Sequence, residues 1–272
     1  MTTESLPIKE QFVLFVDLLG SSEASKSDDF EKQRSIVDLL QAIRSQVSEE
    51  SVTVTLSDDA RGHSGRLGEI RISPEFSAFS DHFIASYRLP DDQNLFGKYF
   101  WLNLFLQEAQ RIIGMVSFRA LDLGLLIRGG ITIGILHHES GVVFGKGLVE
   151  AYELESKVSI YPRIVVGPKI YQDASDDMKK LLYQDKDGIW HLNYFRAMSE
   201  HAFEMNDEDS NERSVEWYQV TQRPLNENIN SLEQDGKLKE MQKWFWFKDK
   251  LETIIGSDWR FISSELRGVE YD

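Results

Sequence analysis

The sequence predicts an α+β fold in which helices pack on a mainly antiparallel sheet, and three kinds of pattern support this class. Short runs rich in β-branched and aromatic residues, such as 11–18 and 164–166, are typical of buried strands. Longer segments with apolar residues every three or four positions, 28–47 and 94–120, predict amphipathic helices. Residues 74–87 read as a hairpin. This order of strands, helices and hairpin is that of a sheet covered by helices.

The first half of the chain is expected to begin with a strand and end with a helix. The strand at 11–18 runs into a Gly/Ser turn, Leu19-Gly20-Ser21-Ser22, and Ser27 or Asp28 then caps the helix that extends to Val47. Alternating apolar and polar residues predict a two-stranded insertion at 52–73, with a polar tip that we expect to be mobile. In the hairpin at 74–87, Ser80 and Asp81 form the tight turn.

The second half is expected to complete the sheet and to end in one long helix. The predicted elements are strands at 125–135, 142–144 and 164–166, a helix at 148–157, minor strands at 189–194 and 215–220, and a terminal helix at 225–255. The acid-rich run 200–216 predicts a solvated loop. We divide the chain into a core, residues 1–170, and a C-terminal α/β extension, residues 171–272, that packs on the core or on a dimer partner.

Composition excludes several classes of protein. The 272 residues include 45 acidic and 30 basic side chains, a formal net charge of −15, and no cysteine. The lack of cysteine rules out a disulfide scaffold, a cysteine-ligated zinc site and thiol catalysis. The acidic charge argues against binding along a nucleic-acid polymer. Because the N-terminus is polar and the apolar stretch 114–135 is interrupted by charged residues, we expect a cytoplasmic protein with no membrane span.

Two aspartates stand out by their surroundings. Asp17 lies at the end of an apolar strand, where an ionised carboxylate is costly unless it is paired or bound to metal. Asp81 lies at the expected hairpin turn. If the hairpin pairs with the first strand, both carboxylates would face one point and form a hard-oxygen site suited to Mg²⁺ or Mn²⁺. The backbone of the turn at 19–22 suits phosphate oxygens. Turn capping by the aspartates is the alternative.

Three other motifs favour ordinary structural roles. His137-His138-Glu139 is expected to be a loop pair rather than a metal site, because adjacent strand residues point to opposite faces. Gly145-Lys146-Gly147 lacks the remaining residues of a phosphate-binding P-loop and reads as a turn. The aromatic cluster Trp244-Phe245-Trp246-Phe247 is expected to pack on the core or on a dimer partner rather than to stack on bases, since four consecutive residues cannot all face inward on one helix.

Five short motifs occur in order between about residues 11 and 170. They are Phe15-Val16-Asp17-Leu18-Leu19-Gly20-Ser21, Phe79-Ser80-Asp81, Arg128-Gly129-Gly130-Ile131 with Gly134, Phe144-Gly145, and Ala151-Tyr152-Glu153-Leu154-Glu155. Together this set resembles the class III nucleotidyl cyclase domain. Within that family it is most similar to the pyrimidine cyclases of bacterial Pycsar antiphage systems.

The resemblance implies a ferredoxin-like core that works as a head-to-tail homodimer, with active sites at the subunit interface. The implied reaction closes a ribonucleoside triphosphate to a 3′,5′-cyclic monophosphate and releases diphosphate. Asp17 and Asp81 would be the catalytic aspartates that bind two Mn²⁺ or Mg²⁺ ions, and the Leu18 backbone carbonyl would complete the coordination of one ion. The implied nucleotide-binding residues are Phe15, Leu19, Gly20, Ser21 and Ser77.

The chain departs from the pattern of purine cyclases at three positions. Ser77, four residues before Asp81, replaces the Lys or Glu that reads a purine base in those enzymes. Val149 and Glu153 occupy the places of an Asn and an Arg that steady the transition state. The missing positive charge would come from Arg128 or Lys146. Two further candidates for that charge are Lys157 and Arg163, although each of the four also reads as a solvated or salt-bridged residue.

We therefore expect a pyrimidine nucleotide cyclase that converts UTP, rather than CTP, into a cyclic nucleotide signal for antiphage defence. A purine cyclase is an alternative that Ser77 disfavours. A second alternative, kept open by the loss of the Asn/Arg pair, is a catalytically silent cyclase-like module that binds a nucleotide or a partner.

Overall fold

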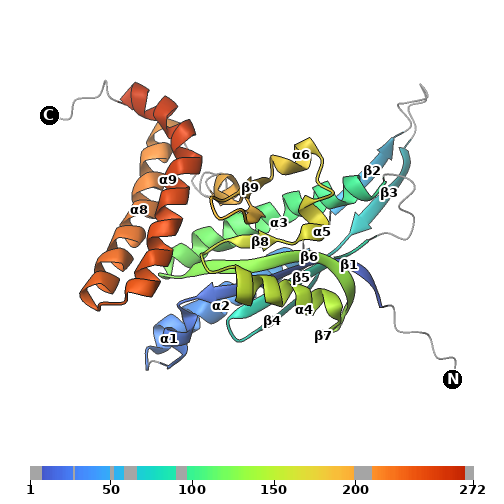
Figure 1. The fold of residues 1–272 in the computed structure, drawn as a ribbon, viewed down its shortest axis with the longest axis horizontal. Helices are drawn as coiled ribbons and strands as arrows, with labels where there is room; N and C mark the ends of the chain where they lie inside the picture. Colours follow the sequence, from blue (N-terminus) through green and yellow to red (C-terminus); the bar gives the residue numbers. More distant parts are fainter. Residues whose placement is uncertain are drawn as a thin grey trace.

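A computed structural model describes residues 8–26, 28–49, 52–57, 66–89, 97–198 and 210–266. It confirms an α+β fold built on an eight-stranded, largely antiparallel sheet with helices on both faces (Figure 1). The strand order is β4-β5-β1-β6-β8-β10-β9, and β7 pairs with β6. These strands are β1 (Lys9–Leu19), β4 (Glu75–Phe79), β5 (His82–Arg88), β6 (Leu126–Glu139), β7 (Val142–Phe144), β8 (Ile164–Val166), β9 (Leu182–Gln184) and β10 (Trp190–Leu192).

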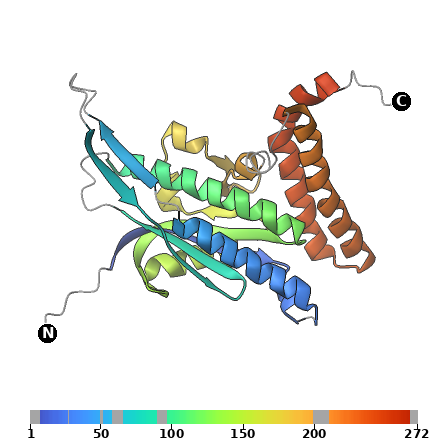
Figure 2. The same ribbon diagram turned by 180° about the vertical axis from the view of Figure 1, so that it is seen from behind.

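The helices flank the sheet and continue beyond it as a C-terminal pair. They are α1 (Ser21–Lys26), α2 (Phe30–Glu49), α3 (Gly97–Asp122), α4 (Lys146–Glu153) followed by the π-helix η2 (Leu154–Val158), α5 (Pro168–Tyr171), α6 (Asp176–Lys179), α8 (Ser210–Gln234) and α9 (Leu238–Leu266). Helices α2 and α3 lie side by side on one face, and α4 lies on the other (Figures 1 and 2). None of the helices in the described part of the chain combines the length and apolar composition needed to cross a membrane.

Strand β1 is central and is buried on both faces. Its even-numbered residues, including Phe12 and Leu14, join the main core under α2 and α3, while Val13 and Phe15 join a smaller core under α4. This period of two follows from the alternation of side chains along a strand. It also places Asp17 on the face that carries α4.

The approach of α4 to the sheet depends on glycine. A Cβ added at Gly130 in β6 would overlap the carbonyl oxygen of Ala151 and would lie 2.6 Å from Cβ of Leu154. Any larger residue would therefore push α4 and η2 off the sheet. The Arg128-Gly129-Gly130 motif is in this respect a packing motif.

The predicted insertion at 52–73 forms its own antiparallel pair. Strands β2 (Val52–Ser57) and β3 (Arg66–Ile72) pair with each other outside the main sheet. They form an arm that projects from the end of the molecule opposite α8 and α9 (Figures 1 and 2). The expected mobile tip lies outside the described residues.

The C-terminal region differs from the sequence-based expectation in three ways. Residues 215–220 belong to helix α8 and not to a strand. Residues 210–216 of the acid-rich run are helical rather than a loop, and 200–209 lie outside the described residues. The expected single terminal helix is two helices, with a break at Gly236, whose φ is +66°. The buried residues Thr221, Leu225 and Ile229 recur every four positions, a helical period that a six-residue window at 215–220 does not reveal.

Two smaller motifs are also placed by the fold. His137 and His138 lie at the end of β6 and not in a loop, and only His138 is buried. In the aromatic cluster of α9, Trp244 and Phe247 pack into the main core while Phe245 is half exposed. The predicted packing of this cluster on the core is therefore confirmed for its inward-facing residues.

Candidate functional site

Asp17 lies between two charged neighbours because β1 lies between β5 and β6. In the register of the sheet, Asp17 is directly opposite His82 on one side and Arg128 on the other. Directly paired residues of neighbouring strands project from the same face, so the three side chains meet. Asp17 is buried, as its place at the end of an apolar strand predicts.

The Asp17 carboxylate is bound on both oxygens. Arg128 Nε donates a hydrogen bond to Asp17 Oδ2 at 2.8 Å, and His82 Nε2 lies 3.3 Å from Asp17 Oδ1. Arg128 Nε also lies 2.6 Å from Oε1 of Glu155, a residue of η2 whose side chain is almost fully buried. Since Nε carries a single hydrogen, it donates to Asp17, and its attraction to Glu155 is electrostatic. Burial raises the pKa of Glu155, although the nearby Arg128 charge opposes that shift.

Asp81 occupies the hairpin turn that the sequence predicts. The turn is tight, with φ of +54° at Ser80, and the backbone N–H of Leu18 donates to the Asp81 carbonyl at 3.0 Å. The Ser21 hydroxyl donates to Asp81 Oδ2 at 2.6 Å. Partial burial opposes ionisation of this carboxyl, but the hydrogen bonds from Ser21 and Ser80 outweigh it and lower the Asp81 pKa.

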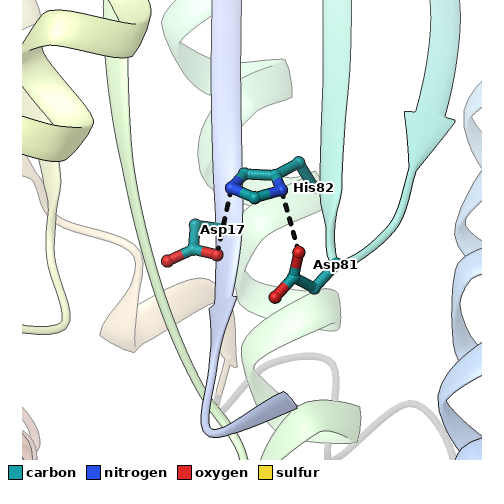
Figure 3. A group of neighbouring side chains, drawn as sticks. All are labelled: Asp17, Asp81 and His82. Atoms are coloured by element: carbon teal, nitrogen blue, oxygen red, sulfur yellow. Dashed lines mark ion pairs between the residues drawn. The ribbon is translucent and has the colours of Figure 1, made fainter. Parts of the chain in front are cut away.

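His82 lies between the two carboxylates (Figure 3). Its Nδ1 is 2.9 Å from Asp81 Oδ1, while its Nε2 faces Asp17. A neutral imidazole has one donor and one acceptor nitrogen, so one of these contacts then joins two acceptors. The cluster also holds three carboxylates, those of Asp17, Asp81 and Glu155, against one guanidinium, and this excess of negative charge favours a bound cation. One ligand atom from each of Asp17, Asp81 and His82 lies within 4.8 Å of the others, which suits a metal ion.

The cluster opens into a cavity of about 540 Å³. One wall is the end of β1 with the turn that follows it, and another is the C-terminal helix pair. Leu18, Leu19, Gly20 and Ser21 line the first wall together with Asp17 and Asp81. The residues of α8, α9 and their connection that line the cavity are Asn228, Ser231, Leu232, Asp235, Lys237, Glu240, Lys243 and Trp244.

Three of the expected site residues do not line the cavity. Phe15 is buried under the cluster, where its ring contacts His82, Phe79 and Tyr152. The Ser77 hydroxyl is 2.9 Å from His138 Nε2, and Ser77 does not line the cavity. Lys146 is exposed at the start of α4, 3.6 Å from Glu150.

The other basic candidates are also engaged in ion pairs. Lys157 Nζ lies 2.6 Å from Glu153 Oε1 on the surface. Arg163 is buried and pairs with Asp185 and Asp187 of the β9–β10 connection, at 3.1 Å and 2.7 Å. Of the four cations considered from the sequence, Arg128 is therefore the one that contacts an aspartate of the cluster.

Sequence reasoning missed His82, Glu155 and the contribution of α8 and α9. The signal for His82 was its position next to Asp81, since pairing of the hairpin with β1 puts it opposite Asp17. Glu155 lies in a quoted motif, but a π-helix that turns it inward has no clear local signature. The cavity-lining residues of the helix pair begin at Asn228, more than 140 positions from Asp81 in the chain, and no pattern within the pair indicates where it docks.

No protein-family model and no curated protein sequence matches this chain. Eleven chains of solved structures do match. One of them is the structure of a bacterial light-regulated adenylyl cyclase, which is 13% identical, with a TM-score of 0.38. The match covers 80% of this chain and 58% of that chain, so this protein spans little more than half of it. A likeness of this size carries no information about substrate or activity.

Proposed function

We propose that the protein is a metal-dependent nucleotidyl cyclase, which closes a ribonucleoside triphosphate to a 3′,5′-cyclic monophosphate and releases diphosphate. The observation that carries this proposal is the meeting of Asp17 and Asp81 beside the turn at 19–21 in one cavity. These are the two aspartates and the turn that the resemblance to class III cyclases assigns to metal and triphosphate.

The donor set fits a divalent cation. Asp17 and Asp81 offer carboxylate oxygens, which Mg²⁺ and Mn²⁺ prefer, and the excess of carboxylates leaves the cluster in need of positive charge. The Leu18 carbonyl, on the strand between Asp17 and the turn, is the further ligand that the resemblance implies. When bound, the metal would help ionise the attacking hydroxyl and neutralise the leaving diphosphate.

Arg128 is the protein cation best placed to act beside the aspartates. Asp17 and Glu155 both lie within ion-pair distance of its Nε, which limits its freedom before substrate arrives. A fixed cation stabilises developing phosphoryl charge without reorganisation during the reaction. The Ser21 hydroxyl holds the Asp81 carboxylate and so keeps this ligand oriented toward the cavity.

We propose a pyrimidine triphosphate, UTP rather than CTP, as substrate and antiphage signalling as the role. Both follow from the resemblance. The Ser77 environment is compatible with this choice because its partner His138 is buried, with its pKa lowered to about 4, and adds no charge near pH 7. The uncharged Ser77 hydroxyl thus differs from the charged Lys or Glu with which purine cyclases recognise the base.

We also propose a homodimer with sites at the subunit interface. An apolar surface supports it. Phe79 and Tyr152 are 53% and 48% exposed, and both contact Phe15 beneath the cluster. Phe144 and Val149, at 74% and 54%, extend the exposed apolar residues along β7 and α4. Exposed aromatic residues next to a polar site are typical of surfaces that bind a protein partner.

A silent cyclase-like module is the second candidate, and one observation favours it. Val149 is exposed and Glu153 is paired with Lys157, so neither supplies the transition-state charge that an Asn and an Arg give purine cyclases. Such a module would bind a nucleoside triphosphate through the same aspartates and release it unchanged.

The test is incubation with each of the four ribonucleoside triphosphates plus Mn²⁺, followed by mass spectrometry of the products. We expect one cyclic monophosphate and diphosphate, and loss of nearly all product in Asp17→Ala and Asp81→Ala. Asp176→Asn, which alters a fully exposed aspartate on α6, is the matched control and should keep wild-type turnover. Binding of a non-hydrolysable triphosphate without any product would support the silent module instead.

A further inference from the structure

The wall of the cavity that faces the cluster comes from the C-terminal helix pair of the same chain. The connection between α8 and α9 lies at the same end of the molecule as α1, the helix that follows the turn after β1 (Figures 1 and 2). Lys237 in this connection has its Nζ 2.8 Å from Glu23 Oε1 on α1. This contact joins the helix pair to the segment that would hold the triphosphate.

Helix α9 is also fixed to the sheet by a buried charge network. Lys250 Nζ lies 2.7 Å from Asp185 Oδ1, and Trp246 Nε1 donates to Asp185 Oδ2 at 3.1 Å. Arg163, just before β8, binds the same carboxylate. Because Lys250, Asp185 and Arg163 are almost fully buried, α9 is held in a defined position over the cavity.

Three acidic residues that line the cavity, from α1 and from the helix pair, act on one lysine. Glu23, Asp235 and Glu240 all favour the charged form of Lys237, and the hydrogen bond to Glu23 is the main cause of its raised pKa. The positive charge of Lys237 is therefore already balanced by these carboxylates. Its contact with Glu23 links the helix pair to α1.

Two other lysines of the cavity are differently placed. Lys32 of α2 and Lys243 of α9 both line it and are half-buried. Among the residues that the structure describes, neither ammonium group has an ion pair or a hydrogen bond. A half-buried ammonium without an acidic partner favours binding of an anion, since partial desolvation weakens its alternative contacts with water.

From these contacts we propose that Lys32 and Lys243 bind the phosphate chain of the nucleotide, so that helix α9 contributes to the binding site from the same chain as the aspartates. That the polyphosphate belongs to a nucleotide rests on the proposed function. The aspartate cluster would hold one side of the phosphates through divalent cations, and the two lysines would contact oxygens on another side. A lysine ammonium contacts phosphate oxygens as a compact point charge, so this contact does not depend on which base the nucleotide carries.

The test uses the full chain and inorganic tripolyphosphate with Mg²⁺, measured by isothermal titration calorimetry. We expect Lys32→Gln and Lys243→Gln each to weaken binding about tenfold, the size expected for one charge-assisted contact. The double variant should lose more than either single variant. Lys243→Arg, which keeps the charge, should retain most of the affinity.

Lys239→Gln is the matched control, because Lys239 is an exposed lysine of α9 that does not line the cavity. It should bind tripolyphosphate as the wild type does. The inference is overturned if the wild type does not bind the probe, or if both glutamine variants bind it as tightly as the wild type while their melting temperatures stay unchanged.

Failure of the cyclase proposal would look different. A wild-type protein that binds tripolyphosphate through both lysines, yet forms no cyclic product from any triphosphate, supports this inference and rejects the activity. A protein that forms a cyclic product but whose glutamine variants bind the probe normally rejects this inference and leaves the activity in place.

Discussion

At the scale of single residues, the charged groups of the cluster contact one another in series, so each is stabilised by its neighbours. Glu155 and Asp17 contact Arg128, Asp17 and Asp81 contact His82, and Asp81 accepts a hydrogen bond from Ser21. Two buried carboxylates next to one guanidinium are stable only while that cation is present. Removing Arg128 would leave both carboxylates in a medium that solvates them poorly.

This dependence predicts that Arg128→Gln destabilises the fold by about 2–3 kcal/mol, less than for a fully buried pair because Arg128 is 26% exposed. Adding Glu155→Gln removes the nearby negative charge and should recover about half of the loss. Urea denaturation of the wild type, both single variants and the double variant gives the coupling energy. Strict additivity of the two single effects would contradict a direct Arg128–Glu155 interaction.

At the scale of elements, the decisive contact is the one between β6 and the α4–η2 segment. Gly130 lets this segment lie on the strand, and η2 in turn directs Glu155 toward Arg128. A second set of hydrogen bonds joins the neighbouring strands around His138. The Ser86 hydroxyl lies 2.8 Å from His138 Nδ1 and donates to Gln11 Oε1 at 2.9 Å. The Ser77 hydroxyl contacts His138 Nε2, so the buried imidazole has a partner on each nitrogen. These hydrogen bonds link β1, β5 and β6, the three strands that carry Asp17, His82 and Arg128.

We predict that Gly130→Ala destabilises the protein by about 2–3 kcal/mol, because the new methyl group would overlap the Ala151 carbonyl and α4 cannot move without losing its core contacts. It should also lower activity, since Glu155 would shift with η2. Thermal denaturation measures the first effect. Ile135→Val, at an exposed position of the same strand, is the control and should change the stability little. Wild-type stability of Gly130→Ala would show that α4 is not held this closely.

At the scale of the whole molecule, local patterns predict the central sheet but not how distant parts meet. The strand at 11–18 and the hairpin at 74–87 could be predicted because alternation and turn residues are local signals, and their pairing brings Asp17 and Asp81 together as expected. His82 follows only once the register is known. That Lys32 and Lys243 line the same cavity could not be predicted, because docking of α9 depends on buried charges from three separate segments. The helix break at Gly236 was missed because the apolar period continues on both sides of it.

The position of α9 depends on the buried charge network around Asp185. Asp185 is almost fully buried between Lys250 and Arg163, and replacing it with Asn removes the charge that balances both cations. We expect Asp185→Asn to lower the stability by about 3 kcal/mol at pH 7. Amide protons of α9 should also exchange faster in this variant, because the helix would open more often while the central sheet stays protected.

The pH dependence of the stability distinguishes a contribution from the Asp185 charge from one due to packing. Burial opposes ionisation of Asp185, but the hydrogen bond from Lys250, with the other donors around it, outweighs burial and lowers its pKa below the ordinary value of 3.8. A carboxyl with a lowered native pKa stabilises the fold above its unfolded pKa, and this contribution is lost as the pH falls through the native value. The difference in melting temperature between wild type and Asp185→Asn should therefore stay constant from about pH 7 to 5 and shrink below about pH 4. A difference that persists undiminished at pH 3 would mean that the lost contribution is packing rather than charge. The docking of α9, and with it the position of Lys243 in the cavity, would then not depend on the charge of Asp185.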